Sequence, residues 1–88
     1  MSAPEGWTLD PLRLDESLAI WIREHSPDDD TRARVREFIQ WLEIEPLTRG
    51  SEDPDHPGVW FGRVNGTNVG VTYVPVQTTL VVYVSVIA

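Results

Sequence analysis

The sequence has 88 residues, enough for one domain with one hydrophobic core. Its fourteen acidic and seven basic residues give a net charge of −7, which disfavours nonspecific binding to nucleic-acid phosphates. The absence of cysteine excludes disulfides and thiolate metal ligands, and it fits a reducing compartment. The N-terminus lacks the basic and apolar regions of a signal peptide, and the C-terminal apolar region alternates as strands do, so no membrane partner is expected. We expect a single domain over residues 1–88, with a flexible N-terminus over residues 1–6.

The first half of the chain predicts a short extended segment and a helix. Trp7–Leu9 could add a strand at one edge of a sheet. Asp10 is then suited to be the N-cap of a helix with Pro11 in its first turn, and this helix should run to about His25. Its apolar side chains share one helical face, which we assign to the core: Leu14, Leu18, Trp21 and Ile22.

A second helix is predicted directly after the first. Ser26 can cap it and Pro27 suits its first turn, so the helix should run from Pro27 to about Ile44 and end before Pro46. Its core stripe has helical spacing: Val35, Phe38, Ile39 and Leu42. Trp41 lies off this stripe, so it is either covered by the N-terminal segment or offered to a partner.

The second half of the chain predicts a loop and three antiparallel strands. The loop covers residues 47–58 and is rich in proline, glycine and acidic residues. The strands cover residues 59–64, 68–73 and 80–87. Asn65 and Gly66 predict a two-residue hairpin turn, and Pro75 predicts a turn before the last strand, because proline cannot donate to a strand ladder.

The predicted register assigns each strand residue to one of two sheet faces. The two-residue turn sets Phe61 opposite Gly70, and pairing Tyr73 with Leu80 sets Tyr83 opposite Gly70 from the other side. The face toward the helices would then hold Trp60, Val64, Val69, Val71, Tyr73, Leu80, Val82, Val84 and Val86. The outer face would hold Val59, Phe61, Arg63, Asn68, Thr72, Val81, Tyr83, Ser85 and Ile87.

This pattern predicts an α+β fold with two N-terminal helices packed on one face of a three- to four-stranded antiparallel sheet. The outer face carries Phe61 and Tyr83 beside a polar row of Arg63, Asn68 and Ser85. An apolar face with a few polar groups is typical of a binding site, so we expect contact with a partner there. A covering loop or a homodimer would also account for this face.

The polar clusters elsewhere have plain structural explanations. His25 suits the C-terminal end of the first helix, where its charge complements the helix dipole. His56, with Asp53 and Asp55, is half of a metal site at most, and a solvated surface explains it better, so no metal and no cofactor is predicted. The arginines of the second helix either form a phosphate-binding row or pair with neighbouring acids: Arg32, Arg34 and Arg36.

Five segments together resemble the RelE/ParE toxin superfamily of bacterial toxin–antitoxin systems. Val35–Pro46 is similar to the family's second helix and the proline that ends it, and Leu47–Gly50 is similar to the connection that follows. Gly58–Val64, Val69–Tyr73 and Leu80–Val84 are similar to its last three strands.

The resemblance implies a cytoplasmic bacterial toxin-like domain that is neutralised by an antitoxin-like protein or peptide and targets gyrase or the ribosome. Arg63 matches an arginine of the family's first hairpin strand. The arginine that is usual on the family's next strand would fall near Gly70 in this sequence, and it is missing. Our first hypothesis is therefore a toxin-like domain that acts by protein binding through Phe61, Asn68, Ser85 and Trp41. The alternatives are a ribosome-dependent mRNA endonuclease with Arg63 and Tyr83 as catalytic residues, or a non-toxic homodimeric interaction module.

Overall fold

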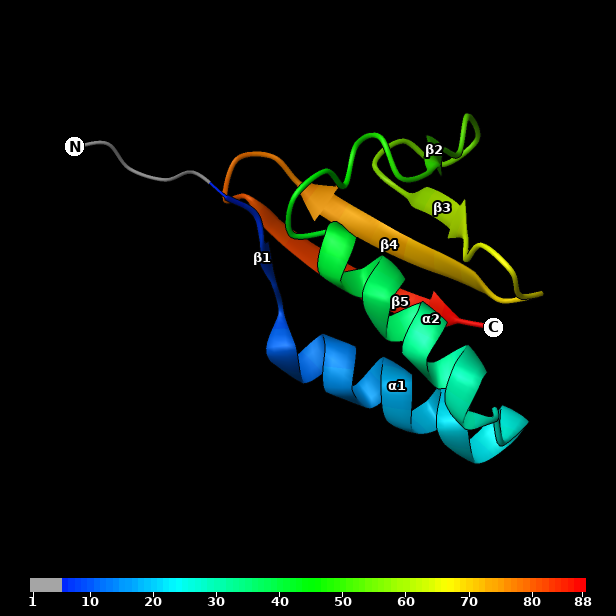
Figure 1. The fold of residues 1–88 in the computed structure, drawn as a ribbon. Coiled ribbons are helices and arrows are strands. Elements are labelled where there is room, and N and C mark those ends of the chain that lie inside the picture. The colour runs from blue at the N-terminus through cyan, green and yellow to red at the C-terminus, as the bar shows by residue number, and fades with distance from the viewer. Residues whose placement is uncertain (1–5) are drawn as a thin grey trace.

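The computed structural model describes residues 6–88 (Figure 1). The elements are, in chain order, β1 (Thr8–Leu9), α1 (Pro11–His25), α2 (Asp29–Trp41), β2 (Ser51–Glu52), β3 (Trp60–Arg63), β4 (Gly70–Val76) and β5 (Val81–Ile87). The predicted α+β class is confirmed. The flexible N-terminus predicted for residues 1–6 lies outside the described residues, except for Gly6.

The strands form one five-stranded sheet in the order β1-β5-β4-β3-β2. β1 runs parallel to β5, and every other pair is antiparallel. The prediction of three to four antiparallel strands was therefore wrong in strand count, and its direction was wrong only for the pairing of β1 with β5. β2 has only two residues, both polar, so no alternation distinguishes it from the loop expected over residues 47–58. β1 is equally short and is held by two backbone bonds of 2.9 Å, from Thr8 N–H to Leu80 and from Asp10 N–H to Val82.

The first helix begins where the capping pattern predicted, and the second helix begins later than predicted. Asp10 caps α1 by accepting from the Arg13 amide at 2.9 Å, as predicted. α2 begins at Asp29 rather than Pro27, because Asp28 is its N-cap and accepts from the Thr31 amide at 2.8 Å. Ser26 instead ends α1 in the left-handed conformation, with φ at 45°. α2 also ends at Trp41 rather than near Ile44.

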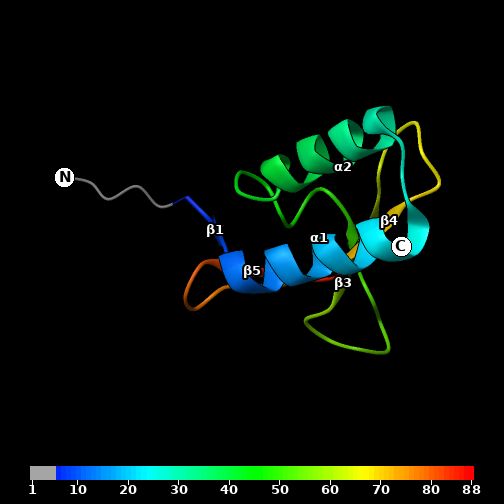
Figure 2. The ribbon, with the colours of Figure 1, turned by 90° about the horizontal axis from the view of Figure 1, so that it is seen from below.

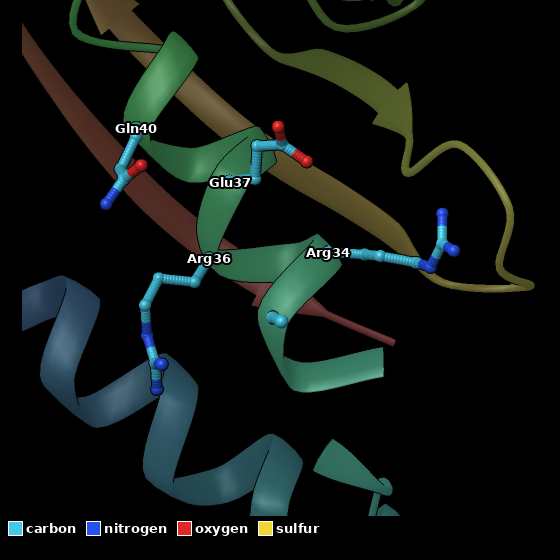
Figure 3. A pocket seen from close by; sticks show the side chains of 5 residues that line it. Arg34, Arg36, Glu37 and Gln40 are labelled. Atoms are coloured by element: carbon cyan, nitrogen blue, oxygen red, sulfur yellow. The ribbon is translucent and has the colours of Figure 1, made fainter. Parts of the chain in front are cut away.

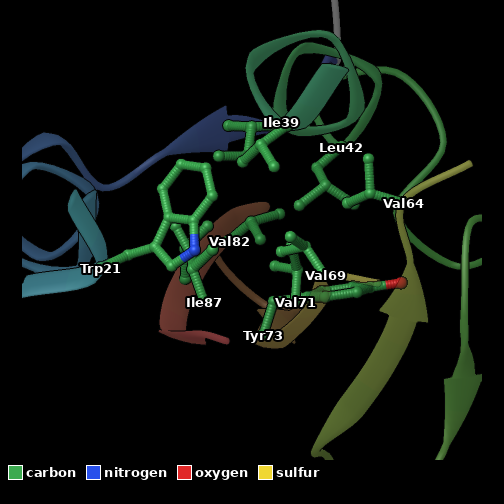
Figure 4. Close-up of a cluster of buried hydrophobic side chains, with 11 residues drawn as sticks. Trp21, Ile39, Leu42, Val64, Val69, Val71, Tyr73, Val82 and Ile87 are labelled. Atoms are coloured by element: carbon green, nitrogen blue, oxygen red, sulfur yellow. The ribbon is translucent and has the colours of Figure 1, made fainter. Parts of the chain in front are cut away.

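The core lies between the helices and one face of the sheet. α2 crosses in front of β4 and β5 in Figure 1, while α1 runs beside β5, and Figure 2 shows both arrangements from below. Figure 4 shows the buried side chains of this core meeting from both helices and the sheet. They are Trp21, Val35, Ile39, Leu42, Val64, Val69, Val71, Tyr73, Val82, Val84 and Ile87. The predicted helical core stripes are confirmed. Four of their residues are partly buried against this core: Leu14, Leu18, Ile22 and Phe38.

α1 covers the part of the β5 edge that the short strand β1 leaves unpaired. β1 pairs only with Val81 and Val82. Beyond them, the buried Ser17 hydroxyl lies 2.7 Å from the Val84 carbonyl oxygen and 3.1 Å from that of Ser85. A hydroxyl has one proton to donate, so the shorter contact is the hydrogen bond. This bond satisfies a backbone acceptor that would otherwise be buried without a partner.

The chain reversal after α2 is anchored by the hydroxyl of Tyr73. The Tyr73 side chain is fully buried, and its hydroxyl donates to the carbonyl oxygen of Pro46 at 2.7 Å. Burial disfavours the charged phenolate and raises the pKa of Tyr73 from 10.0 to about 12. Pro46 is buried as well, so this bond connects the core strand β4 to the loop that leads into β2 and β3.

Neither helix within residues 6–88 has the length and apolar content needed to cross a bilayer.

Replacing Tyr73 with phenylalanine tests this anchor. The buried Pro46 carbonyl would lose its donor, so we expect Tyr73→Phe to lower the free energy of unfolding by about 1–2 kcal/mol near neutral pH. Folding raises the pKa of Tyr73, so the neutral hydroxyl contributes to stability. This contribution should be fully present below about pH 10 and should be lost as the pH rises toward about 12. The phenylalanine variant should lack this contribution to the alkaline loss. Urea denaturation followed by circular dichroism across this pH range measures both effects.

The sequence makes this titration unusually clean. It contains no lysine, and its only other tyrosine is the exposed Tyr83. Tyr83→Phe is therefore the matched control and should retain the wild-type pH dependence. If the free energy of unfolding fell equally with rising pH in the wild-type protein and in Tyr73→Phe, the role given to the buried hydroxyl would be wrong.

Candidate functional site

The candidate site is the face of the sheet that points away from α2, called here the open face. Its position depends first on the pairing of β3 with β4. The predicted turn at Asn65 and Gly66 forms, with the Thr67 amide donating to the Val64 carbonyl at 3.2 Å and Gly66 at φ 78°, but the predicted register was wrong. Arg63 pairs with Gly70 and Phe61 with Thr72. The turn spans residues 65–68, and the Thr67 hydroxyl stabilises it by donating to the Val64 carbonyl at 2.9 Å. The shift moves each pair by an even number of residues, so side chains keep their predicted faces.

The register of β4 with β5 also differs from the prediction. Tyr73 pairs with Val84 instead of Leu80, and Tyr83 pairs with Val74 instead of Gly70. The strand β4 extends through Pro75, which was predicted to lie in a turn. Proline is accommodated because the pairing with β3 stops at Tyr73, so its missing N–H removes no bond to that strand.

A bulge in β5 changes which side chains of its last residues face outward. Tyr73 pairs with Val84 but Thr72 pairs with Val86, so Ser85 is an extra residue on β5. Val86 therefore lies on the open face and is 50% exposed, whereas Ile87 enters the core at 5%. The prediction had these two residues the other way round. A strand pattern with strict alternation carries no sign of an inserted residue, so Val86 was missed as a site residue.

The open face presents its apolar side chains in a cross-strand row. Phe61, Thr72 and Val86 pair across β3, β4 and β5, and Phe61 is 46% exposed. The Phe61 ring covers Gly70, where an added Cβ would overlap the ring carbons, as the sequence predicted. Tyr83 is also exposed, at 38%, but it lies farther along β5 and not over Gly70.

The predicted polar row of the open face does not form. Arg63 is exposed on β3, but Asn68 lies in the turn before β4 rather than in a strand. Ser85 is half-buried at the bulge, where its hydroxyl lies 3.4 Å from an Arg13 guanidinium nitrogen. The two candidate catalytic residues are also apart. Arg63 is opposite Gly70 and Tyr83 is opposite Val74, a separation of about 13 Å along the strands.

An acidic loop borders the open face next to β3. Figure 2 shows the β2–β3 connection projecting from the sheet on the side away from α2. Within it, Asp53 accepts from the Asp55 amide at 2.9 Å and lies 3.0 Å from the His56 ring. These two contacts lower the pKa of Asp53 and keep its carboxylate charged. No three metal-binding side chains converge anywhere in the described part of the chain.

Trp41 does not belong to the open face. It lies at the end of α2, on the opposite side of the sheet, and is 38% exposed. The guanidinium of Arg49 stacks on its ring, 4.4 Å from the centroid. The sequence offered two explanations for Trp41, cover by the N-terminal segment or contact with a partner. The N-terminal segment lies largely outside the described residues. Within residues 6–88, the side chain that covers the ring is Arg49.

The arginines of α2 form no phosphate-binding row. Figure 3 shows Arg34 and Arg36 pointing in different directions from a shallow hollow that Glu37 and Gln40 also line. Arg34 pairs instead with Asp30 at 2.9 Å, and this carboxylate raises the pKa of Arg34. The interpretation of these arginines as partners of neighbouring acids is thus the better one for Arg34.

The contact between Phe61 and Gly70 can be tested by a double-mutant cycle. Gly70→Ala should cost about 1 kcal/mol of unfolding free energy, because the new methyl group must displace the Phe61 ring. In the Phe61→Ala background the same substitution should be neutral or stabilising, since the space is then empty. Urea denaturation of the four proteins measures the coupling. Equal effects of Gly70→Ala in both backgrounds would show that the ring does not rest on this residue.

The open face thus combines an exposed apolar row with a charged border, and its candidate catalytic side chains are dispersed. Such a surface is suited to binding another macromolecule rather than to acting on a small substrate held in a closed pocket. Comparison of the chain with protein-family models, with curated proteins and with solved structures gives no significant match.

Proposed function

We propose that this chain is a protein-binding domain whose open face is the docking surface. The observation that carries the proposal is the cross-strand row of Phe61, Thr72 and Val86, in which the two apolar side chains remain about half exposed. An antiparallel sheet commonly exposes one face, but that face is then mostly polar. Aromatic and aliphatic side chains gathered on such a face are typical of an interface with another protein.

The proposed biological role is that of a toxin-like component of a bacterial toxin–antitoxin pair, with an antitoxin-like protein as the partner. It is supported by the order of the elements, two helices followed by an antiparallel meander, which the resemblance to the RelE/ParE superfamily implies. Gyrase or the ribosome would be the target, as in that family. Fold-level analogy is the basis of this part of the proposal.

The endonuclease alternative has less support. Cleavage of RNA requires a base, an acid and cationic stabilisation of one phosphate. Arg63 and Tyr83 are separated by about 13 Å along the sheet, too far to act on the same phosphate in this arrangement. A homodimeric module without toxicity would use the same apolar row and is an outcome of the test below.

Growth of bacteria that express the chain from an inducible promoter tests the toxin-like role. The wild-type protein should arrest growth, and Phe61→Ser should restore colony formation because it removes the largest apolar contact of the open face. Leu12→Ser is the matched control: Leu12 is an apolar residue at 81% exposure on the first turn of α1, outside the open face, and its substitution should leave the arrest unchanged.

Immunoblotting must show equal amounts of the three proteins. If the wild-type chain leaves growth unaffected, or if both substitutions relieve the arrest equally, the toxin-like role is wrong. Size-exclusion chromatography of the same proteins then identifies the homodimeric alternative, in which wild type and Leu12→Ser would elute as dimers and Phe61→Ser as a monomer.

A further inference from the structure

The apolar row of the open face continues beyond the sheet onto α1. A groove of about 160 Å³ lies between α1 and the end of β5, and both Val86 and Ile20 line it. Ile20 is 40% exposed, so it adds a third apolar side chain to the row that Phe61 begins. Two spacings between strands and one between the sheet and a packed helix give this extended row a length of about 20 Å.

Acidic side chains border both ends of this row. At the β3 end lies the β2–β3 loop, which carries Asp53 and Asp55. At the α1 end, Glu24 lines the same groove as Ile20.

The basic groups near the row do not balance these acids. Arg13 lies near Ser85 but pairs with Glu16 at 3.2 Å. Arg63 is the one arginine that the described strands place on the open face itself. His25 and His56 also lie near the two ends and carry charge only when protonated. The border of the row is therefore predominantly negative at neutral pH.

We infer that the open face binds an amphipathic helical segment whose apolar side chains cover the row and whose two ends carry lysine or arginine. The inference rests on the proposed function, because it describes the chemistry of the partner at the same docking surface. A helix of about 13 residues spans 20 Å, which matches the length of the row. Basic residues at its ends would meet the acids around Asp55 and Glu24, where opposite charges favour binding and like charges oppose it.

A second copy of the chain fits this surface less well. Two copies meeting face to face through a two-fold axis would place the same acidic borders near each other. With a net charge of −7 on each copy, the overall repulsion adds to this local effect. The charge around the row thus favours a basic partner over self-association.

Two synthetic peptides of about 18 residues test the inference. They share one helical apolar face of leucine and tryptophan, and one carries two lysines at each end where the other carries two glutamates. Titrated into the 15N-labelled chain, the lysine peptide should shift the amides of Ile20, Thr72 and Val86 and bind at least about tenfold more tightly than the glutamate peptide. Added salt should reduce this difference, because it screens the charges.

Substitutions locate the binding and its charge preference. Val86→Asp should abolish binding of the lysine peptide, whereas Leu12→Asp, at an exposed apolar position outside the row, should leave it unchanged. Glu24→Lys combined with Asp55→Lys should reduce or reverse the preference between the two peptides. All four substitutions are at exposed positions, and circular dichroism confirms that the variants fold.

The outcomes separate this inference from the function on which it rests. Equal affinities for the two peptides, or amide shifts confined to α2, would overturn the inference. Concentration-dependent shifts at the row without any peptide would assign it to a second copy and overturn it as well. If the lysine peptide binds as expected but expression leaves growth unaffected, the toxin-like role fails and the docking chemistry stands. If Phe61→Ser relieves toxicity but neither peptide binds, the inference fails while the function stands.

Discussion

The pairing of β4 with β5 determines which surface this protein presents. β4 is the central strand, and its register with β5 decides which side chains face the helices. One extra residue at Ser85 reverses the alternation, so that Ile87 completes the core and Val86 joins Phe61 on the open face. A bulge of this kind bends a strand and redirects its side chains, here at the point where the sheet meets α1.

The two edges of the sheet are covered in different ways. The accessible apolar surface is therefore the open face and not an edge. α1 covers the β5 edge, and Ser17 supplies the hydrogen bond that the short strand β1 cannot provide. At the opposite edge, β2 pairs with only the first half of β3, and the acidic β2–β3 loop follows. Covered edges and nearby charges oppose uncontrolled strand pairing, which exposed edges otherwise invite.

The arrangement of the open face supports its proposed role as a docking surface. Its apolar side chains come from β3, β5 and α1 and line up across the strands, whereas the polar groups expected to act together are separated by the register. The acids at the border are the basis for the inferred preference for a basic partner and for the salt dependence expected of it. Gly70 lies closely packed under Phe61, and this contact helps to hold the ring in place.

Much of this fold follows from local sequence patterns. The capping of α1 by Asp10, the helical core stripes and the assignment of Phe61 and Tyr83 to the outer face all depend on contacts between near neighbours or on simple periodicity. Such features are independent of the register, because shifts by an even number of residues preserve the faces of a strand. The toxin-like role, by contrast, rests on resemblance.

Only the tertiary structure decided how the elements meet. The bulge at Ser85, the strand pairing through Pro75 and the parallel direction of β1 result from long-range packing, which adds side-chain and backbone contacts between segments far apart in the chain. Three further features follow from that packing. Arg63 lies apart from Tyr83, Arg49 stacks on the ring of Trp41, and the apolar row extends to Ile20. Alternation along the sequence specified the two faces of the sheet, but the position of each residue along a face depends on hydrogen-bond partners that local patterns do not encode.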